Sequence, residues 1–401
     1  MASLQYQILV QLILFTKFCQ AWTGKNDGAY SLRMRVLSVH RYGAKGDGTD
    51  ATLAFKMTWM EACSSAAPVV FMVPWQGIYL LNPIVFSGPC KSIVIMKIQG
   101  SIIASSRSNW VATDRMHWIL FKAVDNLHIN GGGTITGNGQ TWWTNSCKID
   151  RSLVCTAAPT ALTFYRCNNL NMNKLNIKDS QQIHVSIEQC SNVKISRLII
   201  TAPEKSPNTD GIHVGRTKNI SIKRCIIRTG DDCISIVDGS MNVKVTELSC
   251  GPGHGISIGS LGAQNSYGYV SNVVVENAQL EGTTNGVRIK TWQGGRGYVK
   301  NITFRNINMR NVGNPIIIDQ NYCDSRNPCK RQRKAVSVKN VVYKNIHGTS
   351  ATPIAVKFDC SESVPCRGIT LRNIYLTGGG SFCRNARSVK KSGYIVPATS
   401  C

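Results

Sequence analysis

Four short segments of the sequence bring together carboxylates, a histidine and two cations. In chain order they are Asn208-Thr209-Asp210, Gly230-Asp231-Asp232, Gly253-His254-Gly255 and Arg288-Ile289-Lys290. Hydrolysis needs one protonated acid to donate to the leaving oxygen and one ionised base to activate water. Crowded carboxylates supply that split, because their mutual repulsion raises one proton affinity while a neighbour stays charged. The residue types therefore predict acid–base hydrolysis.

The same segments align in one frame, since each is accompanied by alternating β-branched residues. Under this alignment one position is held by Asp210, Asp232, His254 and Asn285, and a second by His213, Ser235, Ser257 and Arg288. The competing interpretation is a structural network of charged groups or a cation site. Recurrence of reactive side chains at one repeat position favours a functional site.

The two cations indicate the kind of ligand. Arg288 and Lys290 are two apart on a strand, so they share one face while Ile289 points inward. A guanidinium grips a carboxylate with two prongs, and an ammonium acts as a point charge. The pair therefore predicts an acidic sugar as the ligand.

An asparagine repeat identifies the scaffold that must position these groups. Asparagine followed by alternating apolar residues recurs at Asn126, Asn169, Asn192, Asn219, Asn242, Asn272, Asn301, Asn340 and Asn373. From Asn169 to Asn340 the spacing between neighbours is 23 to 39 residues. A period of this size built from short strands indicates a solenoid.

The predicted fold is an all-β, right-handed parallel β-helix in one domain, with a short N-terminal helical cap over Thr52 to Cys63. Rungs of such a coil stack ~4.8 Å apart, and equivalent asparagines bond up the stack as ladders. We therefore expect Asp210 and Asp232 on neighbouring rungs. His254 should continue the row, and Asp231 should point elsewhere in the same cleft.

The composition of the chain indicates which class of partner it binds. The chain has 401 residues, 43% hydrophobic and 17% charged, as in globular proteins. Its net charge of +25 predicts a polyanionic partner. Nucleic acid is the least favoured, because no aromatic–basic interleaving or known module occurs, and we expect no membrane partner. The basic run from Lys330 to Lys334 is either a polyanion contact or a solvated loop.

Sixteen cysteines without paired CxxC sets indicate disulfides in an oxidising compartment. Pairs close in sequence are Cys147/Cys155, Cys323/Cys329, Cys360/Cys366 and Cys383/Cys401. Cys167 and Cys190 each precede a repeat asparagine by two residues, which predicts stacked buried thiols or one bridge. An apolar run from Ile8 to Phe15 predicts a signal peptide over residues 1–24, followed by a catalytic domain over residues 25–401.

The four motifs, in this order, resemble the signature motifs of the polygalacturonases, the pectinases of glycoside hydrolase family 28. Residues 257–262 and 291–295 resemble the plant branch, and the similarity runs from about Tyr42 to Cys401. The resemblance implies a secreted, cell-wall enzyme, monomeric and without cofactor or metal. It would hydrolyse α-1,4 bonds between galacturonic acid units of pectin with inversion, acting within the chain.

The resemblance also implies a role for each residue. Asp231 would be the acid, Asp210 and Asp232 would hold the attacking water, and acid and base would lie ~6.5–9.5 Å apart. His254 would tune the acid. The predicted substrate-binding residues are Arg288, Lys290, Tyr322, Asn208 and His213. His184 is a weaker candidate, expected to share the outward strand position of His213 and Ser235.

Two other functions fit this architecture. One is a pectin-binding β-helix without turnover, which the presence of all three carboxylates disfavours. The other is a calcium-dependent pectate lyase, which would release unsaturated product absorbing in the ultraviolet and would be abolished by a chelator. Ultraviolet-silent scission distinguishes the hydrolase from the lyase.

Overall fold

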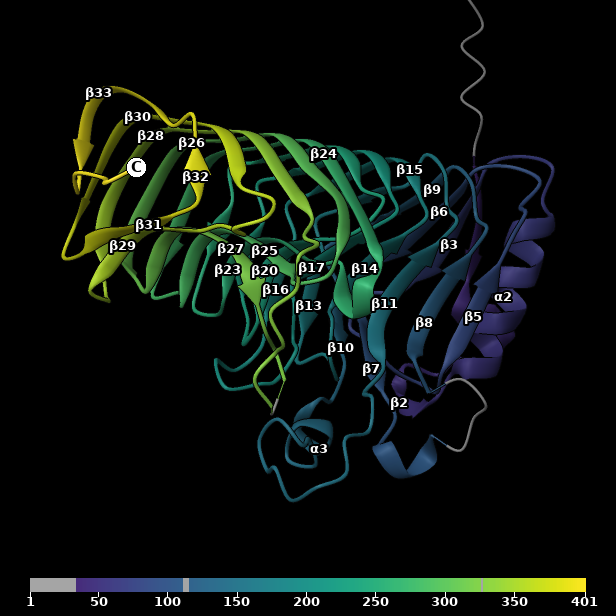
Figure 1. Cartoon of the computed structure of the whole chain (residues 1–401). Coiled ribbons are helices and arrows are strands. Elements are labelled where there is room, and N and C mark those ends of the chain that lie inside the picture. The colour runs from purple at the N-terminus through teal and green to yellow at the C-terminus, as the bar shows by residue number, and fades with distance from the viewer. Residues whose placement is uncertain (1–33, 111–114, 326) are drawn as a thin grey trace, which may run out of the picture. The chain divides into compact units, whose positions relative to one another are not determined.

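The structure is a computed structural model that describes residues 34–110, 115–325 and 327–401. Arg35–Cys401 form one unit, a coil of parallel strands (Figure 1). The predicted signal peptide over residues 1–24 lies outside the described residues. No helix in the described ranges is long and apolar enough to cross a membrane.

One turn of the coil shows how the chain is wound. It consists of β17 (Ile212–Gly215), β18 (Lys218–Lys223) and β19 (Ile226–Arg228), and β20 (Asp232–Ile236) then begins the next turn. β17 pairs with β20 in parallel, with Ile212 opposite Ile234. Each turn thus adds one parallel strand to each face, which confirms the predicted right-handed parallel β-helix.

The strands form two sheets. The eleven-stranded sheet holds β5 (Ile84–Ser87), β8 (His117–Lys122), β11 (Thr160–Tyr165), β14 (Val185–Glu188), β17, β20, β23 (Gly255–Leu261), β25 (Asn285–Trp292), β27 (Asn314–Tyr322), β29 (Ile354–Asp359) and β31 (Gly380–Arg384). The 22-stranded sheet spans the other faces and holds β1 (Arg35–Ser38), β2 (Asp47–Asp50), β3 (Val69–Val73), β4 (Ile78–Leu81), β6 (Val94–Ile98), β7 (Ser101–Ala104), β9 (Leu127–Asn130), β10 (Thr134–Thr136), β12 (Asn171–Asn173), β13 (Asn176–Lys178), β15 (Ser191–Ser196), β16 (Ile199–Thr201), β18, β19, β21 (Met241–Thr246), β22 (Ser249–Cys250), β24 (Tyr267–Glu281), β26 (Arg296–Val312), β28 (Ser337–Ser350), β30 (Cys366–Thr377), β32 (Ala386–Arg387) and β33 (Lys390–Val396).

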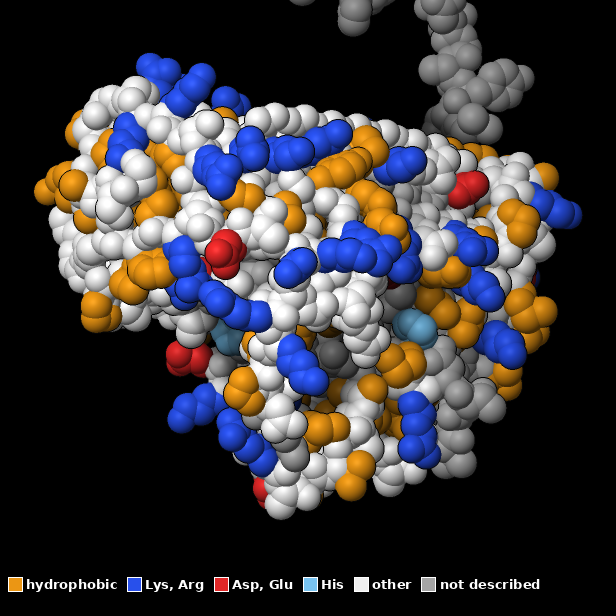
Figure 2. Space-filling view, viewed as in Figure 1, with side chains coloured by type: hydrophobic (Ala, Val, Ile, Leu, Met, Phe, Trp, Pro, Cys, Tyr) orange, Lys and Arg blue, Asp and Glu red, His pale blue; other side chains and the backbone are white. Residues whose placement is uncertain are grey.

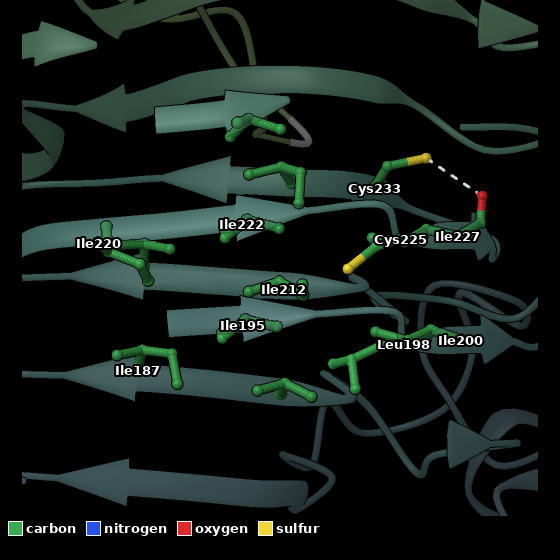
Figure 3. Packing of buried hydrophobic residues seen from close by; sticks show 14 of the residues in the cluster. Ile187, Ile195, Leu198, Ile200, Ile212, Ile220, Ile222, Cys225, Ile227 and Cys233 are labelled. Atoms are coloured by element: carbon green, nitrogen blue, oxygen red, sulfur yellow. Dashed lines mark hydrogen bonds between the residues drawn. The ribbon is translucent and has the colours of Figure 1, made fainter. Parts of the chain in front are cut away.

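Inward side chains of successive turns stack into the core. Ile187, Ile212 and Ile234 come from neighbouring strands and are fully buried. Figure 3 shows Ile187 and Ile212 among other side chains of this core. Burying one such side chain contributes about 1.5–3 kcal/mol. The period-2 alternation of each strand is therefore what fixes which residues face the outside.

The predicted asparagine ladder is present. Each asparagine Nδ2 donates to Oδ1 of the preceding rung, at 2.9 to 3.3 Å, through Asn192, Asn219, Asn242, Asn272, Asn301 and Asn340. These residues have φ between 54° and 58°, a left-handed conformation that asparagine tolerates. Asn373 belongs instead to a second ladder, where it donates to Asn345.

A helix caps the N-terminal end of the coil and packs into its core. The helix α2 (Thr52–Ser64) places Phe55 and Trp59 in the core, and thereby confirms the predicted cap. Short helices or turns lie at η1 (Val39–Tyr42), η2 (Arg107–Asn109), α3 (Gln140–Trp143) and η3 (Ala263–Asn265).

Six disulfides among the described residues include all four pairs that are close in sequence, Cys147–Cys155, Cys323–Cys329, Cys360–Cys366 and Cys383–Cys401. Cys63–Cys90 and Cys233–Cys250 were not predicted. Cys167 and Cys190 are buried free thiols, so of the two predicted alternatives the stacked thiols are correct.

Candidate active site

One cleft of about 510 Å³ on the outer face of the eleven-stranded sheet contains every predicted site residue except His184. They are Asn208, Asp210, His213, Asp231, Asp232, His254, Arg288, Lys290 and Tyr322. These residues are up to 114 positions apart in the sequence. Winding of the chain is what makes them neighbours.

The strand register agrees with the alignment of the motifs. His213 lies opposite Ser235, Ser235 opposite Ser257, and Ser257 opposite Arg288, along β17, β20, β23 and β25. An irregularity between Asp232 and Ile234 sets Asp232 opposite Gly255 instead of His254. The expected row of Asp210, Asp232 and His254 is therefore broken at its last member.

Asp232 is the most enclosed of the three carboxylates, with only 2% of its surface exposed. Oδ1 accepts from Ser257 Oγ at 2.7 Å and from Arg288 Nη2 at 2.9 Å. Oδ2 accepts from Lys290 Nζ at 3.0 Å. Two cations and a hydroxyl thus contact this one carboxylate, as is required of a buried charged group, which must be paired and hydrogen-bonded.

Asp231 has a different partner. His254 Nδ1 lies 2.8 Å from Asp231 Oδ1, which also accepts from the Asp232 backbone N–H at 2.8 Å. Asn208 Nδ2 donates to Oδ2 at 3.3 Å. Burial acts to raise the pKa of Asp231, but the hydrogen bond and charge of His254 outweigh it and hold the pKa below its ordinary value. The same bond raises the pKa of His254.

Asp210 lacks a cationic partner among the described residues. Ser235 Oγ donates to its Oδ2 at 2.7 Å, and His213 Nδ1 lies 2.8 Å from the same hydroxyl. The other ring nitrogen of His213 lies 3.4 Å from Glu188 Oε1. Burial, followed by the charges of Asp231 and Asp232, raises the pKa of Asp210 well above its ordinary value.

A row of polar contacts holds the Ser235 hydroxyl against Asp210. Because that hydroxyl donates to Asp210 Oδ2, it accepts from His213 Nδ1. The Glu188 carboxylate lies beside the other ring nitrogen of His213. Glu188, His213 and Ser235 therefore form one row of contacts that ends at Asp210.

An aromatic pair closes the cleft beyond the cations. Lys290 Nζ stands 5.5 Å from the centre of the Tyr322 ring, and Trp292 packs against Tyr322 edge-on at 5.2 Å. Burial, the largest cause, raises the pKa of Tyr322 to about 12. The phenol therefore stays protonated and can donate a hydrogen bond to a ligand.

His184 does not occupy the position expected for it. Ser186, not His184, pairs with His213 across β14 and β17. The His184 ring is fully buried, with Nδ1 3.0 Å from the Asp210 carbonyl oxygen, and burial lowers its pKa to about 4. It supports the backbone that carries Asp210, and the prediction of a substrate contact is wrong.

Glu188 and Ser257 were missed as site residues by sequence reasoning. Ser257 stood in the aligned second position, so its proximity was foreseeable, but its bond to Asp232 was not. Glu188 lies outside all four motifs. The outward alternation of β14, where Ser186 and Glu188 share one face, was the available signal.

A metal ligand set is also conceivable here. Asp231, Asp232 and His254 each place one possible ligand atom within 4.8 Å of the others. Both oxygens of Asp232 already accept hydrogen bonds from cationic side chains, Arg288 and Lys290. Two fixed positive charges oppose a further cation, so the donor set fits an anionic ligand better than a metal.

Comparison with known proteins decides the family. Residues 63–395 match the model of glycosyl hydrolases family 28. The chain belongs to that family. Polygalacturonase-2 of Solanum lycopersicum is 58% identical over 346 residues, which are 86% of this chain and 76% of that protein. A polygalacturonase of Persea americana is 57% identical and covers 86% and 74% of the two chains.

Solved structures agree with this family 28 assignment. Endo-xylogalacturonan hydrolase of Aspergillus tubingensis superposes with a TM-score of 0.76 at 26% identity, over 89% of this chain and 99% of that one. Endopolygalacturonase I of Stereum purpureum has a TM-score of 0.64 at 20% identity, over 84% and 97%. The second likeness concerns the fold alone.

Proposed function

We propose that this family 28 chain hydrolyses α-1,4-galacturonosidic bonds in polygalacturonate. The observation that carries the proposal is the pairing, in one cleft, of three carboxylates with Arg288 and Lys290. Carboxylates supply acid–base chemistry, and the cations select an acidic sugar. The relatives named polygalacturonase support the same substrate class.

The proposed acid is Asp231. Its Oδ1 is engaged by His254 and the Asp232 amide, which leaves Oδ2 with only the longer bond from Asn208. A proton carried by the Asp231–His254 pair would pass from Asp231 to the glycosidic oxygen as the C1–O bond breaks. His254, whose pKa is raised, supplies the reserve from which that proton is drawn.

Asp210 and Asp232 are proposed to hold the attacking water between them. The water oxygen would form the new bond to C1, and its proton would go to Asp210. Burial and the neighbouring carboxylates raise the pKa of Asp210, which makes its ionised form a stronger base than an ordinary aspartate. The Ser235 hydroxyl, which donates to Oδ2, opposes that rise.

The substrate carboxylate is proposed to meet Arg288 and Lys290, with Tyr322 as a neutral donor. Both cations now contact Asp232, so a bound uronate would share them with that carboxylate. His213 and Asn208 line the same cleft and complete the proposed binding residues.

We further propose that the enzyme inverts the configuration at the anomeric carbon and cleaves within the polymer chain. Inverting enzymes ordinarily separate acid and base carboxyls by ~6.5–9.5 Å. Here that range applies to Asp231 and Asp210, the proposed acid and base. The water would be held between Asp210 and Asp232 on the side away from Asp231. The proposed inversion rests on the family likeness, and the anomer released first by the enzyme tests it.

Secretion to the plant cell wall is the setting we propose, with monomeric protein acting on pectin. Six disulfides fit an oxidising compartment, and the basic surface fits a polyanionic polymer. Figure 2 shows Lys and Arg side chains spread widely over the visible face, with few acidic ones.

The deciding experiment incubates the purified protein with polygalacturonate and follows reducing ends together with ultraviolet absorbance. We expect reducing ends to rise with no ultraviolet change, and a chelator to have no effect. Absorbance that rises and is abolished by the chelator would identify a lyase instead. Binding without any reducing ends would identify a non-catalytic pectin-binding protein.

A further inference from the structure

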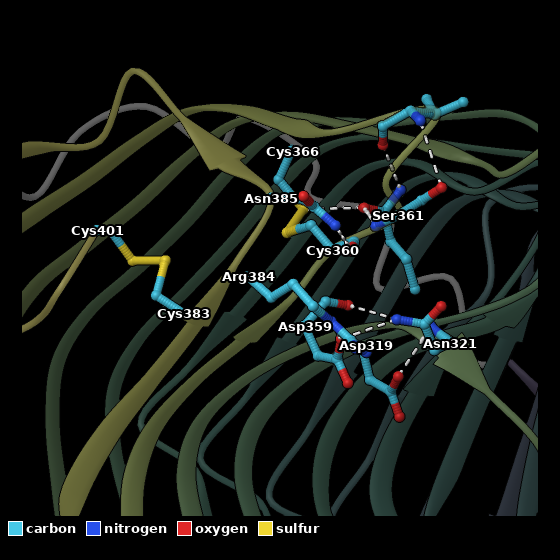
Figure 4. Close-up of a disulfide and its surroundings, with 12 residues drawn as sticks. Asp319, Asn321, Asp359, Cys360, Ser361, Cys366, Cys383, Arg384, Asn385 and Cys401 are labelled. Atoms are coloured by element: carbon cyan, nitrogen blue, oxygen red, sulfur yellow. Dashed lines mark hydrogen bonds and ion pairs between the residues drawn. A yellow bond between two sulfur atoms is a disulfide. The ribbon is translucent and has the colours of Figure 1, made fainter.

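A second pocket, larger than the catalytic cleft, lies farther toward the C-terminal end of the coil. Its volume is about 680 Å³, and it is lined by Gln293, Asn321, Arg331, Gln332, Arg333, Cys360, Ser361, Glu362, Ser363, Arg384 and Asn385. Figure 4 shows part of its wall, where Asn321, Cys360 and Arg384 follow one another on adjacent rungs. No step of the hydrolysis described above uses it.

The pocket begins where the catalytic cleft ends. Tyr322 lines the cleft, and its neighbour Asn321 lines the pocket. Trp292 packs on Tyr322, and its neighbour Gln293 again lines the pocket. A polymer lying along the coil axis and leaving the cleft over Tyr322 therefore arrives at this pocket.

The basic run seen in the sequence forms one wall, and its backbone is pinned. Gln332 N–H donates to Gln293 Oε1 at 3.3 Å, and Gly294 N–H donates to the Lys334 carbonyl at 2.7 Å. Ser363 Oγ donates to the Arg333 carbonyl. Disulfides Cys323–Cys329 and Cys360–Cys366 brace the loop on either side. The loop is thus built into the fold while its side chains stay exposed.

The charge of the lining is mainly positive. Arg331 and Arg333 are exposed and enter none of the ion pairs found among the described residues. Arg384 is held by Asp359 through Nε at 2.9 Å. Glu362 is the one acidic side chain of the lining. Two uncommitted guanidiniums therefore face a pocket of the size that takes a sugar.

We propose that this pocket is a distal subsite that binds a uronate of the same polygalacturonate chain whose scission occurs in the cleft. Arg331 and Arg333 grip its carboxylate. Asn321 and Asn385, whose Nδ2 groups donate to Asp359 and to the Cys360 carbonyl, offer their amide oxygens to its hydroxyls. The inference rests on the proposed substrate class. It makes affinity depend on chain length, because only a substrate that extends past Tyr322 reaches the pocket.

The chain offers a matched test within the same loop. The variant Arg331→Gln/Arg333→Gln removes two charges that line the pocket. The control Lys330→Gln/Lys334→Gln removes two exposed charges from the same loop that do not line it. Each protein is assayed on trigalacturonate and on long polygalacturonate, with the melting temperature as a check on folding.

For the arginine variant we expect kcat/KM on long polygalacturonate to fall about tenfold or more through KM, with the trigalacturonate rate unchanged. The lysine control should stay within about twofold of the unchanged protein on both substrates. An equal fall in the control would show general charge attraction and overturn the subsite. A fall on trigalacturonate, or no change on polymer, would overturn it as well. Failure of the unchanged protein to cleave either substrate would instead refute the proposed function.

Discussion

Two stacks of polar side chains run along this coil with the same spacing between rungs. They differ in whether their members can hydrogen-bond to one another. In the asparagine ladder each amide both donates and accepts, so Asn219, Asn242 and Asn272 bond to one another without outside help. In the carboxylate row Asp210 and Asp232 have no donor to offer each other. At a rung spacing of ~4.8 Å, stacked amides stabilise one another by hydrogen bonding, whereas stacked carboxylates repel one another.

The carboxylate row therefore depends on donors from other positions, and these donors differ between its members. Asp232 accepts from two cations. Among the described residues, Asp210 accepts a side-chain hydrogen bond from Ser235 alone, and burial, followed by the neighbouring carboxylates, raises its pKa. One repeated position thus carries two carboxylates with different partners and different proposed roles. The asparagines of the ladder all have the same kind of partner, so they do not differ in this way.

The largest effect is expected from Asp231→Asn. An amide keeps the shape but cannot donate the proton that the leaving oxygen needs, so kcat should fall about 10²–10⁴-fold. Reducing-end assays and a melting curve measure activity and folding separately. The control is Asp125→Asn, an exposed acid outside the cleft. Activity of Asp231→Asn near that of the control would refute the acid assignment.

His254→Gln should have the next largest effect, with kcat lowered about 10-fold to 100-fold. In the unchanged protein the shared proton is held partly by a histidine whose pKa is raised by Asp231. Activity is thus present below that pKa and is lost as pH rises through it. With glutamine the proton rests on a carboxylate alone, so the alkaline limb of the kcat profile should move to lower pH. An unmoved alkaline limb would exclude His254 from proton supply.

A smaller change in rate is expected from Ser235→Ala, roughly tenfold near the optimum. Its hydroxyl lowers a pKa that burial raises, so its removal raises the pKa of Asp210 further. The base must be ionised, and activity is lost as pH falls through that pKa. The acid limb should therefore shift to higher pH. A shift of the acid limb to lower pH would contradict the role of the Ser235 hydroxyl.

The ladder offers the converse test, with the smallest expected effect on activity. Asn272→Asp places a carboxylate between two asparagines and removes the donor to Asn242. We expect about 1–3 kcal/mol of lost stability, because one acceptor is left unpaired. The rate per folded molecule should stay the same. A fall in kcat at full folding would show that the ladder and the cleft are coupled.

Much of this arrangement was predictable from residue types and spacing. The alternation of apolar residues around Ile212, Ile234 and Ile256 predicts how neighbouring strands pair. That pairing in turn predicts that the motifs lie in one cleft. The disulfides within short loops followed from proximity in sequence. Both inferences use only local pattern and the fixed distance between rungs.

What could not be predicted depends on local irregularity and on contacts between distant loops. The irregularity after Asp232 sends His254 to Asp231, and an alignment without gaps cannot show it. Cys63–Cys90 joins residues 27 apart around the cap, where the repeat gives no guide. The pocket at Arg331 and Arg333 forms because a long loop folds back on Gln293, a contact with no sequence signal.

The most direct test of the central claim follows the configuration of the sugar released first. Proton NMR of polygalacturonate in the first minutes of digestion distinguishes the two anomers at the new reducing end before they equilibrate. Attack by water held against Asp210 and Asp232, opposite the acid Asp231, predicts the β-anomer from the α-linked polymer. Initial release of the α-anomer would mean retention, and one of these carboxylates would then be a nucleophile and not a base.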